Sequence, residues 1–206
     1  MKTEMHASYN AVIRSFHWLT LALIALLFIL AWAIDGLAPA WRGPALQIHK
    51  SLGITVLGLT LVRLAWRVVA GVPAMPGDLP MPQRLAARVT QYMLYGLLLA
   101  QPLVGWLWSS AGKGRITYFF LVQVPWLISP DKRLDKTLGH LHGLLGNVLL
   151  GGIGLHAAAA LYHHFVRRDD ILRGMIRGDA RAIVDLSRRG RRDRLGLPQG
   201  LRSGPD

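Results

Sequence analysis

The chain has 206 residues, of which 52% are hydrophobic, and its mean hydropathy of +0.32 comes from long apolar runs that are typical of an integral membrane protein. The absence of cysteine excludes disulfides, thiolate metal sites, iron–sulfur clusters and covalently attached c-type haem. A formal net charge of +13 would suit nucleic acid, but it equally suits lipid headgroups and membrane topology, and we expect no nucleic-acid partner.

The first apolar run covers residues 16–34 and contains no charged residue. At about 1.5 Å per residue, such a helix is long enough to cross the hydrocarbon core of a bilayer. A cleaved signal peptide is the alternative, because residues 31–33 resemble a small-x-small cleavage site. The polar lead is long for a signal peptide, however, and His17 lies inside the run. We therefore interpret it as a first membrane span.

Two further spans follow in the first half of the chain. A short loop is expected at residues 35–47, and residues 48–69 form the second span, which opens with His49. After a proline-rich connector, residues 89–111 form the third span. It contains Pro102, which membrane helices tolerate as a kink.

The longest connection, residues 112–139, is basic, and its apolar middle at residues 118–128 is too short to span, so we expect it at the membrane interface. Residues 140–165 form the fourth span. The sequence therefore predicts an all-α membrane protein, a four-helix bundle within residues 1–178. The arginine-rich tail, residues 179–206, is expected to be solvated and disordered.

The distribution of positive charge predicts the orientation of this bundle. Four spans place both termini on one side of the membrane, and that side carries most of the 24 lysines and arginines. Only charges close to a span influence orientation strongly, so the charges of the distal tail are left out of the count. The side of the termini still carries more lysine and arginine than the opposite side. Both termini are therefore expected to be cytoplasmic.

The fourth span contains most of the eight histidines, a residue that spans usually exclude because burying an ionisable group in lipid is costly. His142 and His156 are fourteen residues apart, which places them on one helix face about 21 Å apart along the axis. The face between them contains Gly146 and Gly152. These glycines predict either close approach of a bulky cofactor or tight packing against a neighbouring helix.

Depth in the membrane pairs the histidines. His49 and His142 each open a span that runs inward from the outer side, whereas His17 and His156 lie toward the cytoplasmic side. Two bis-histidine sites at two depths favour two non-covalent haem b groups whose natural chemistry is one-electron transfer. A transition-metal site would need three or four ligands at one depth, and carboxylates are missing from these spans. Purely structural histidines are the remaining alternative.

The residues that carry these features resemble the bacterial cytochrome b561 family from about residue 13 to residue 175. The matching segments are RSFHWL, IHKSLG followed by VRLAWR, LYGLLLAQPLVGW, and LHGLLG to LHAAAALYHHFVRRDDILRGM. The resemblance implies haem ligation by the same four histidines, a place in the bacterial inner membrane and electron exchange with quinone. Oxidation of superoxide at the outer face is also attributed to this type of protein. The chain departs from many members at Gln91, where they carry a histidine.

Weaker candidates surround these four ligands. His163 shares the face of His156 and is a candidate contact for a haem propionate or a quinone, and Arg14 is a candidate propionate contact at the inner level. Contact with lipid headgroups is the alternative for both. Three cations are candidates for an outer funnel that steers an anion such as superoxide, or for contacts with lipid phosphates: Lys50, Lys113 and Arg115.

The sequence thus predicts a diheme membrane cytochrome that transfers electrons to or from quinone, with lipid, quinone and either superoxide or a redox protein as partners. Such a protein would be an oxidoreductase that acts as an electron carrier. We assign no catalytic residue to it. The alternative is a haem-bearing membrane anchor of a dehydrogenase or hydrogenase complex.

Overall fold

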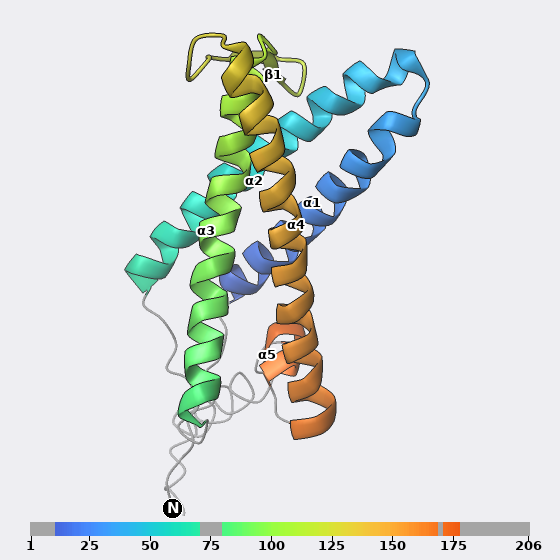
Figure 1. Ribbon diagram of the computed structural model, residues 1–206. Coiled ribbons are helices and arrows are strands. Elements are labelled where there is room, and N and C mark those ends of the chain that lie inside the picture. Colours follow the sequence, from blue (N-terminus) through green and yellow to red (C-terminus); the bar gives the residue numbers. More distant parts are fainter. Residues whose placement is uncertain (1–10, 71–79, 169–170, 178–206) are drawn as a thin grey trace, which may run out of the picture.

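The computed structural model describes residues 11–70, 80–168 and 171–177, and it is dominated by four long helices with a small β-hairpin at one end (Figure 1). The helices are α1 (Ala11–Ala33), α2 (Pro39–Ala70), α3 (Met81–Ala111) and α4 (Lys132–Tyr162). A 3-10 turn, η1 (Ile34–Gly36), joins α1 to α2. A π-helix, η2 (His163–Arg167), and the short α5 (Ile171–Arg177) follow α4.

The four-helix plan predicted from the sequence is confirmed. Three helical stretches of the described chain are long and apolar enough to cross a membrane: Ala11–Gly36, Pro39–Val69 and Lys132–Arg167. The remaining long helix, α3, is less apolar, and its two serines, Ser109 and Ser110, are buried. Ser110, for example, is fully buried and donates a hydrogen bond to the carbonyl of Trp106. Helix α3 therefore belongs to the bundle although its composition is less apolar.

The helices begin earlier than predicted. The loop expected at residues 35–47 is wrong for most of its length, because α2 begins at Pro39. Proline suits the first turn of a helix, where its missing N–H would be unpaired in any case. At the start of α4, the side chain of Asp131 accepts hydrogen bonds from the backbone N–H groups of Arg133 and Leu134. This N-cap starts α4 at Lys132 and shortens the connection predicted at residues 112–139.

That connection contains an antiparallel hairpin that the sequence did not predict. Strand β1 (Ile116–Tyr118) pairs with β2 (Val122–Val124). The hairpin is held against α2, where Ser51 Oγ accepts from the N–H of Phe119 at 2.9 Å and Gln47 Oε1 accepts from the N–H of Thr117 at 3.2 Å. Side chains of α2 therefore fix the hairpin beside the end of the bundle.

We expect Ser51→Ala to destabilise this hairpin. Ser51 is fully buried, and its loss leaves the N–H of Phe119 without its acceptor, which should cost about 1–3 kcal/mol. Thermal unfolding and limited proteolysis of the purified protein measure the effect. Thr137→Ala is the control, because the hydroxyl of Thr137 is exposed and bonds only to a carbonyl of its own helix. Equal stability of both variants would contradict the role of Ser51.

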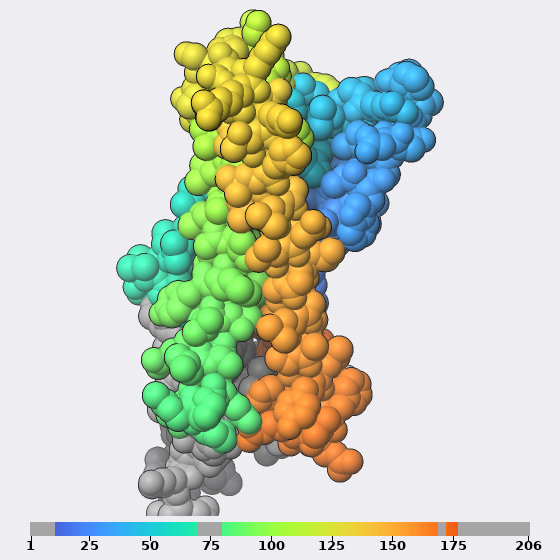
Figure 2. Space-filling view, in the orientation of Figure 1, coloured from blue at the N-terminus to red at the C-terminus, as the bar shows by residue number. Residues whose placement is uncertain are grey.

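The core lies where all four helices meet. Buried side chains from each helix form one cluster: Ile24, Val56, Leu97, Leu98 and Leu149. Two glycines of α4 face α3 closely, because a Cβ at Gly146 would lie 3.2 Å from Gln101 Nε2 and a Cβ at Gly152 would lie 3.0 Å from Met93 Cε. For these two positions the packing interpretation of the glycines is supported. In the space-filling view α1 and the start of α2 lean away from the column of α3 and α4 (Figure 2).

The predicted tail at residues 179–206 lies outside the described residues, as does most of the proline-rich connector between α2 and α3.

Candidate functional site

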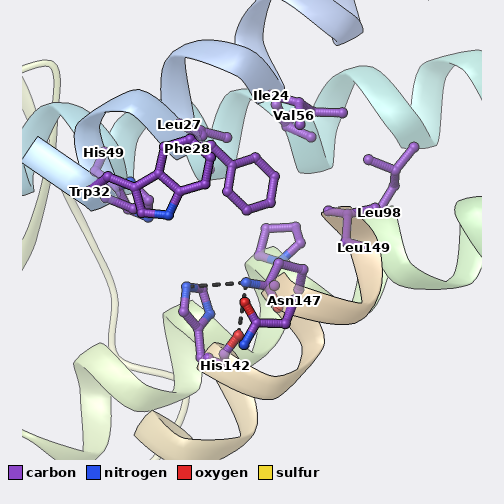
Figure 3. A pocket seen from close by; sticks show the side chains of 16 residues that line it. Ile24, Leu27, Phe28, Trp32, His49, Val56, Leu98, His142, Asn147 and Leu149 are labelled. Carbon is purple, nitrogen blue, oxygen red and sulfur yellow. Dashed lines mark hydrogen bonds between the residues drawn. The ribbon is translucent and has the colours of Figure 1, made fainter. Parts of the chain in front are cut away.

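The structure brings together the two histidines expected at the outer level. His49 of α2 and His142 of α4 have ring centroids 6.3 Å apart with 71° between the ring planes. Both line a cavity of about 220 Å³ between the helices, shown in Figure 3. Every long helix contributes to its wall: Phe28 and Trp32 from α1, Val56 from α2, Leu98 from α3 and Asn147 from α4.

The structure also brings together the two histidines expected at the inner level. His17 of α1 and His156 of α4 have ring centroids 6.2 Å apart with 62° between their planes. Arg63 of α2 lies close enough to interact electrostatically with both rings. Its guanidinium and that of Arg67 lie 5.4 and 5.7 Å from the ring centre of Tyr95. The inner pair therefore has a cationic neighbourhood on the side of α2.

The spacing within each pair suits two axial ligands of one iron. With metal–nitrogen bonds of about 2 Å, two imidazoles on opposite sides of a metal hold their ring centres about 6.3 Å apart. No group of three or more potential metal-ligating side chains comes together in residues 11–70, 80–168 and 171–177. A bare metal ion would thus lack ligands, whereas a porphyrin brings four of its own. The two pairs fit haem.

Two ring nitrogens of the outer pair are buried. The Nδ1 atoms of His49 and His142 have no hydrogen-bond partner among the described residues. Leaving a buried polar atom unpaired is costly, so hydrogen bonding between helices does not account for these two imidazoles.

Helix α3 shapes the position of the His142 ring. A Cβ at Gly105 would lie 2.9 Å from His142 Cε1 and 3.1 Å from His142 Nδ1. Any residue larger than glycine would therefore displace the imidazole ring of His142 from this position. The indole of Trp108 lies 5.6 Å from the imidazole, and Gln101 Nε2 lies 3.3 Å from His142 Nε2. Gln101 and Gly105 were not predicted from the sequence. A polar glutamine inside an apolar run was the available signal, since polar groups in spans are functional by default.

Comparison with known proteins decides the family. A model of the prokaryotic cytochrome b561 family matches residues 8–178. The chain belongs to this family. It is 32% identical over 177 residues to cytochrome b561 homolog 2 of Escherichia coli K12, covering 84% of this chain and 94% of that protein. It is 34% identical over 177 residues to the probable superoxide oxidase CybB of Yersinia pestis, covering 84% and 97%.

Cytochrome b561 homolog 1 of Escherichia coli K12 is 29% identical over 163 residues, covering 78% of this chain and 92% of that protein. Family membership confirms a multi-pass membrane cytochrome with a four-helix bundle, and it implies haem b as the cofactor. The prediction drawn from the resemblance is therefore confirmed at this level.

The weaker candidates have distinct places in this cytochrome b561. Arg14 is half-buried one turn before His17, and His163 is half-buried at the start of η2, with its ring 6.0 Å from that of Tyr162. Their contacts with a propionate or a quinone stay predictions. Gln91, the position where many family members carry histidine, accepts a hydrogen bond from Arg67 at 3.1 Å.

The three outer cations lie near the hairpin. Lys50 follows His49 on α2, and a Cβ at Gly114 would lie 3.1 Å from Lys50 Nζ. Gly114 stands between Lys113 and Arg115, which are both exposed. We call these three residues, Lys50, Lys113 and Arg115, the outer cationic cluster.

Proposed function

We propose that the chain is a diheme membrane cytochrome that transfers electrons between its outer side and quinone. The observation that carries the proposal is the presence of two histidine pairs, with ring centroids 6.3 and 6.2 Å apart, on one bundle. Haem held by the pairs His49–His142 and His17–His156 would supply one-electron oxidation and reduction.

The helices would set the distance between the two sites. Helix α4 contributes one histidine to each pair, and a helical rise of about 1.5 Å per residue separates His142 from His156 by about 21 Å. The buried cluster around Ile24, Val56 and Leu149 lies in the centre of the same bundle. Its apolar side chains would keep water away from the path between the two levels.

Cations near the inner pair would bind the carboxylates of the inner haem. Arg63 lies near both inner histidines, and Arg14 lies one turn before His17. Guanidinium groups form strong charge-assisted hydrogen bonds with carboxylates. His163, beyond His156 on the chain, would contact a propionate or a quinone carbonyl near the same level.

We propose superoxide as the electron donor. Each superoxide would give one electron and leave as dioxygen, and two electrons with two protons would convert one quinone to quinol. Two observations support this choice: a relative that is 34% identical is named a probable superoxide oxidase, and the outer cationic cluster begins at the residue after His49. A positive patch beside the entry site raises the association rate of an anion.

Stopped-flow mixing tests the donor. Superoxide is expected to reduce the haem, and the absorption spectrum of the haem follows this electron transfer. Replacing Lys50, Lys113 and Arg115 by glutamine should lower the second-order rate constant of this reduction about tenfold and weaken the dependence of the rate on salt. Replacing Arg84, Arg88 and Arg168 by glutamine removes the same formal charge elsewhere and should leave the rate unchanged. If superoxide leaves the haem oxidised, the donor is wrong.

For the placement, we propose that residues 1–178 form the membrane domain in the bacterial inner membrane with both termini cytoplasmic. The excess of lysine and arginine on the side of the termini supports this orientation.

The anchor of a dehydrogenase or hydrogenase complex remains the second candidate. The hairpin exposes large apolar side chains, with 56% of Phe120, 82% of Leu121 and 63% of Val122 accessible, and a partner subunit would cover such a surface. Purification from native membranes separates the candidates. A partner in equal amount supports the anchor, and a haem protein that purifies alone and reacts with superoxide supports the independent enzyme.

A further inference from the structure

Gln101 of α3 contacts His142 through its amide nitrogen. Gln101 Nε2 donates a hydrogen bond to the backbone carbonyl of His142 at 3.0 Å and lies 3.3 Å from His142 Nε2 (dashed lines in Figure 3). One contact holds the backbone of the histidine and the other reaches its ring. The amide therefore lies beside both the backbone and the ring of His142.

The packing around Gln101 keeps its amide in this position. Gly146 of α4 lies opposite, and a Cβ there would come within 3.2 Å of Gln101 Nε2. Gln101 also lines the cavity that contains His49 and His142. A glycine on the facing helix thus makes room for a glutamine at the wall of the cavity.

Gln101 is not explained by helix packing alone. Its Oε1 atom is buried and has no hydrogen-bond partner in the part of the chain that the structure describes. Leaving a buried polar atom unpaired costs about 1–3 kcal/mol, and leucine at this position would avoid that cost. The contacts of the amide are made by its donor side, which points to His142.

We propose that Gln101 is a positioning residue that holds His142 and raises the reduction potential of the outer haem. This inference rests on the proposed function. The amide nitrogen carries the positive end of the side-chain dipole, and it lies beside His142 Nε2. Reduced iron carries one positive charge less than oxidised iron, so a positive dipole end beside its ligand favours the reduced form.

A raised potential at the outer level would serve electron entry. An outer site that is easier to reduce accepts electrons readily from a donor at the outer face. Gln91, the glutamine of α3 at the inner end, instead accepts a hydrogen bond from Arg67. The two glutamines of α3 therefore act at different levels, which makes Gln91 a matched control.

A redox titration of Gln101→Leu in the full-length protein tests the proposal. At a fixed applied potential, the ratio of reduced to oxidised outer haem should fall about fivefold, as expected for loss of one interaction worth about 1 kcal/mol. The signal of the outer haem is the one that disappears in His142→Ala. The inner haem of the same sample should titrate as in the wild type, and Gln91→Leu should leave the outer haem unshifted.

The other possible results of the Gln101 variants also support or overturn the proposed role of Gln101. An unshifted outer potential with both haems present overturns the role of Gln101. If Gln101→Leu loses the outer haem, Gln101→Met carries the test, because it keeps the length of the side chain and removes the donor without adding a charge. A lower outer potential in Gln101→Met supports the proposal; an unchanged potential, or loss of the outer haem here too, overturns it. A wild-type protein without a b-type spectrum would overturn the proposed function itself.

Discussion

His142→Ala is expected to leave the purified protein with one haem b per chain, where the wild type has two. His142 faces His49 at 6.3 Å between ring centroids, and alanine would remove one of the two proposed ligands of the outer haem. The inner pair lies about 21 Å away along α4 and keeps both of its histidines. Haem extraction and the reduced absorption spectrum measure the loss, and the potential that remains should be that of the inner haem.

His140→Ala is the matched control for this variant. His140 lies on the same helix two residues earlier and is exposed, so its removal should leave two haems per chain. His156→Ala should remove the other haem and leave the outer one. Retention of both haems in His142→Ala would contradict the assignment of the outer pair.

Gly105→Ala is expected to disturb the outer haem although it removes no ligand. A Cβ at this position would lie 2.9 Å from His142 Cε1, a distance that real side chains essentially never show, and the neighbouring Trp108 limits the movement of the ring. Overpacking of this kind costs about 1–3 kcal/mol, which corresponds to roughly 5- to 150-fold weaker binding of the outer haem. Haem titration of the purified protein measures the change.

Gly96→Ala is the control for this steric effect. Gly96 lies on the same helix, and a Cβ added there would meet nothing within 4 Å, so alanine should be tolerated and both haems should be retained. Equal haem affinity in Gly105→Ala and Gly96→Ala would show that the contact with His142 does not limit ligand geometry.

The sequence predicted the pairing of the histidines because helical rise and membrane depth are local rules. The fourteen-residue spacing of His142 and His156 places one histidine at each level, and His17 and His49, near the starts of the first two predicted spans, supply the partners. Ring centroids 6.2 and 6.3 Å apart agree with that pairing. The role of these histidines as haem ligands stays a proposal.

The features that the sequence analysis missed depend on contacts between distant segments. Gln101 and Gly105 gain their meaning only when α3 packs on α4 beside His142. The hairpin at residues 116–124 was missed because its apolar composition resembles an interfacial segment, and what holds it is a hydrogen bond to Ser51, 68 positions earlier in the chain. Helix starts were predicted too late because polar first turns extend beyond the apolar runs.

The ratio of haem b to polypeptide in the purified wild-type protein tests the central claim most directly. Two histidine pairs, each holding one haem, predict a ratio of two, with absorption of b-type haem and no covalent attachment, as the absence of cysteine requires. A ratio of one, or a protein without haem, would contradict the account.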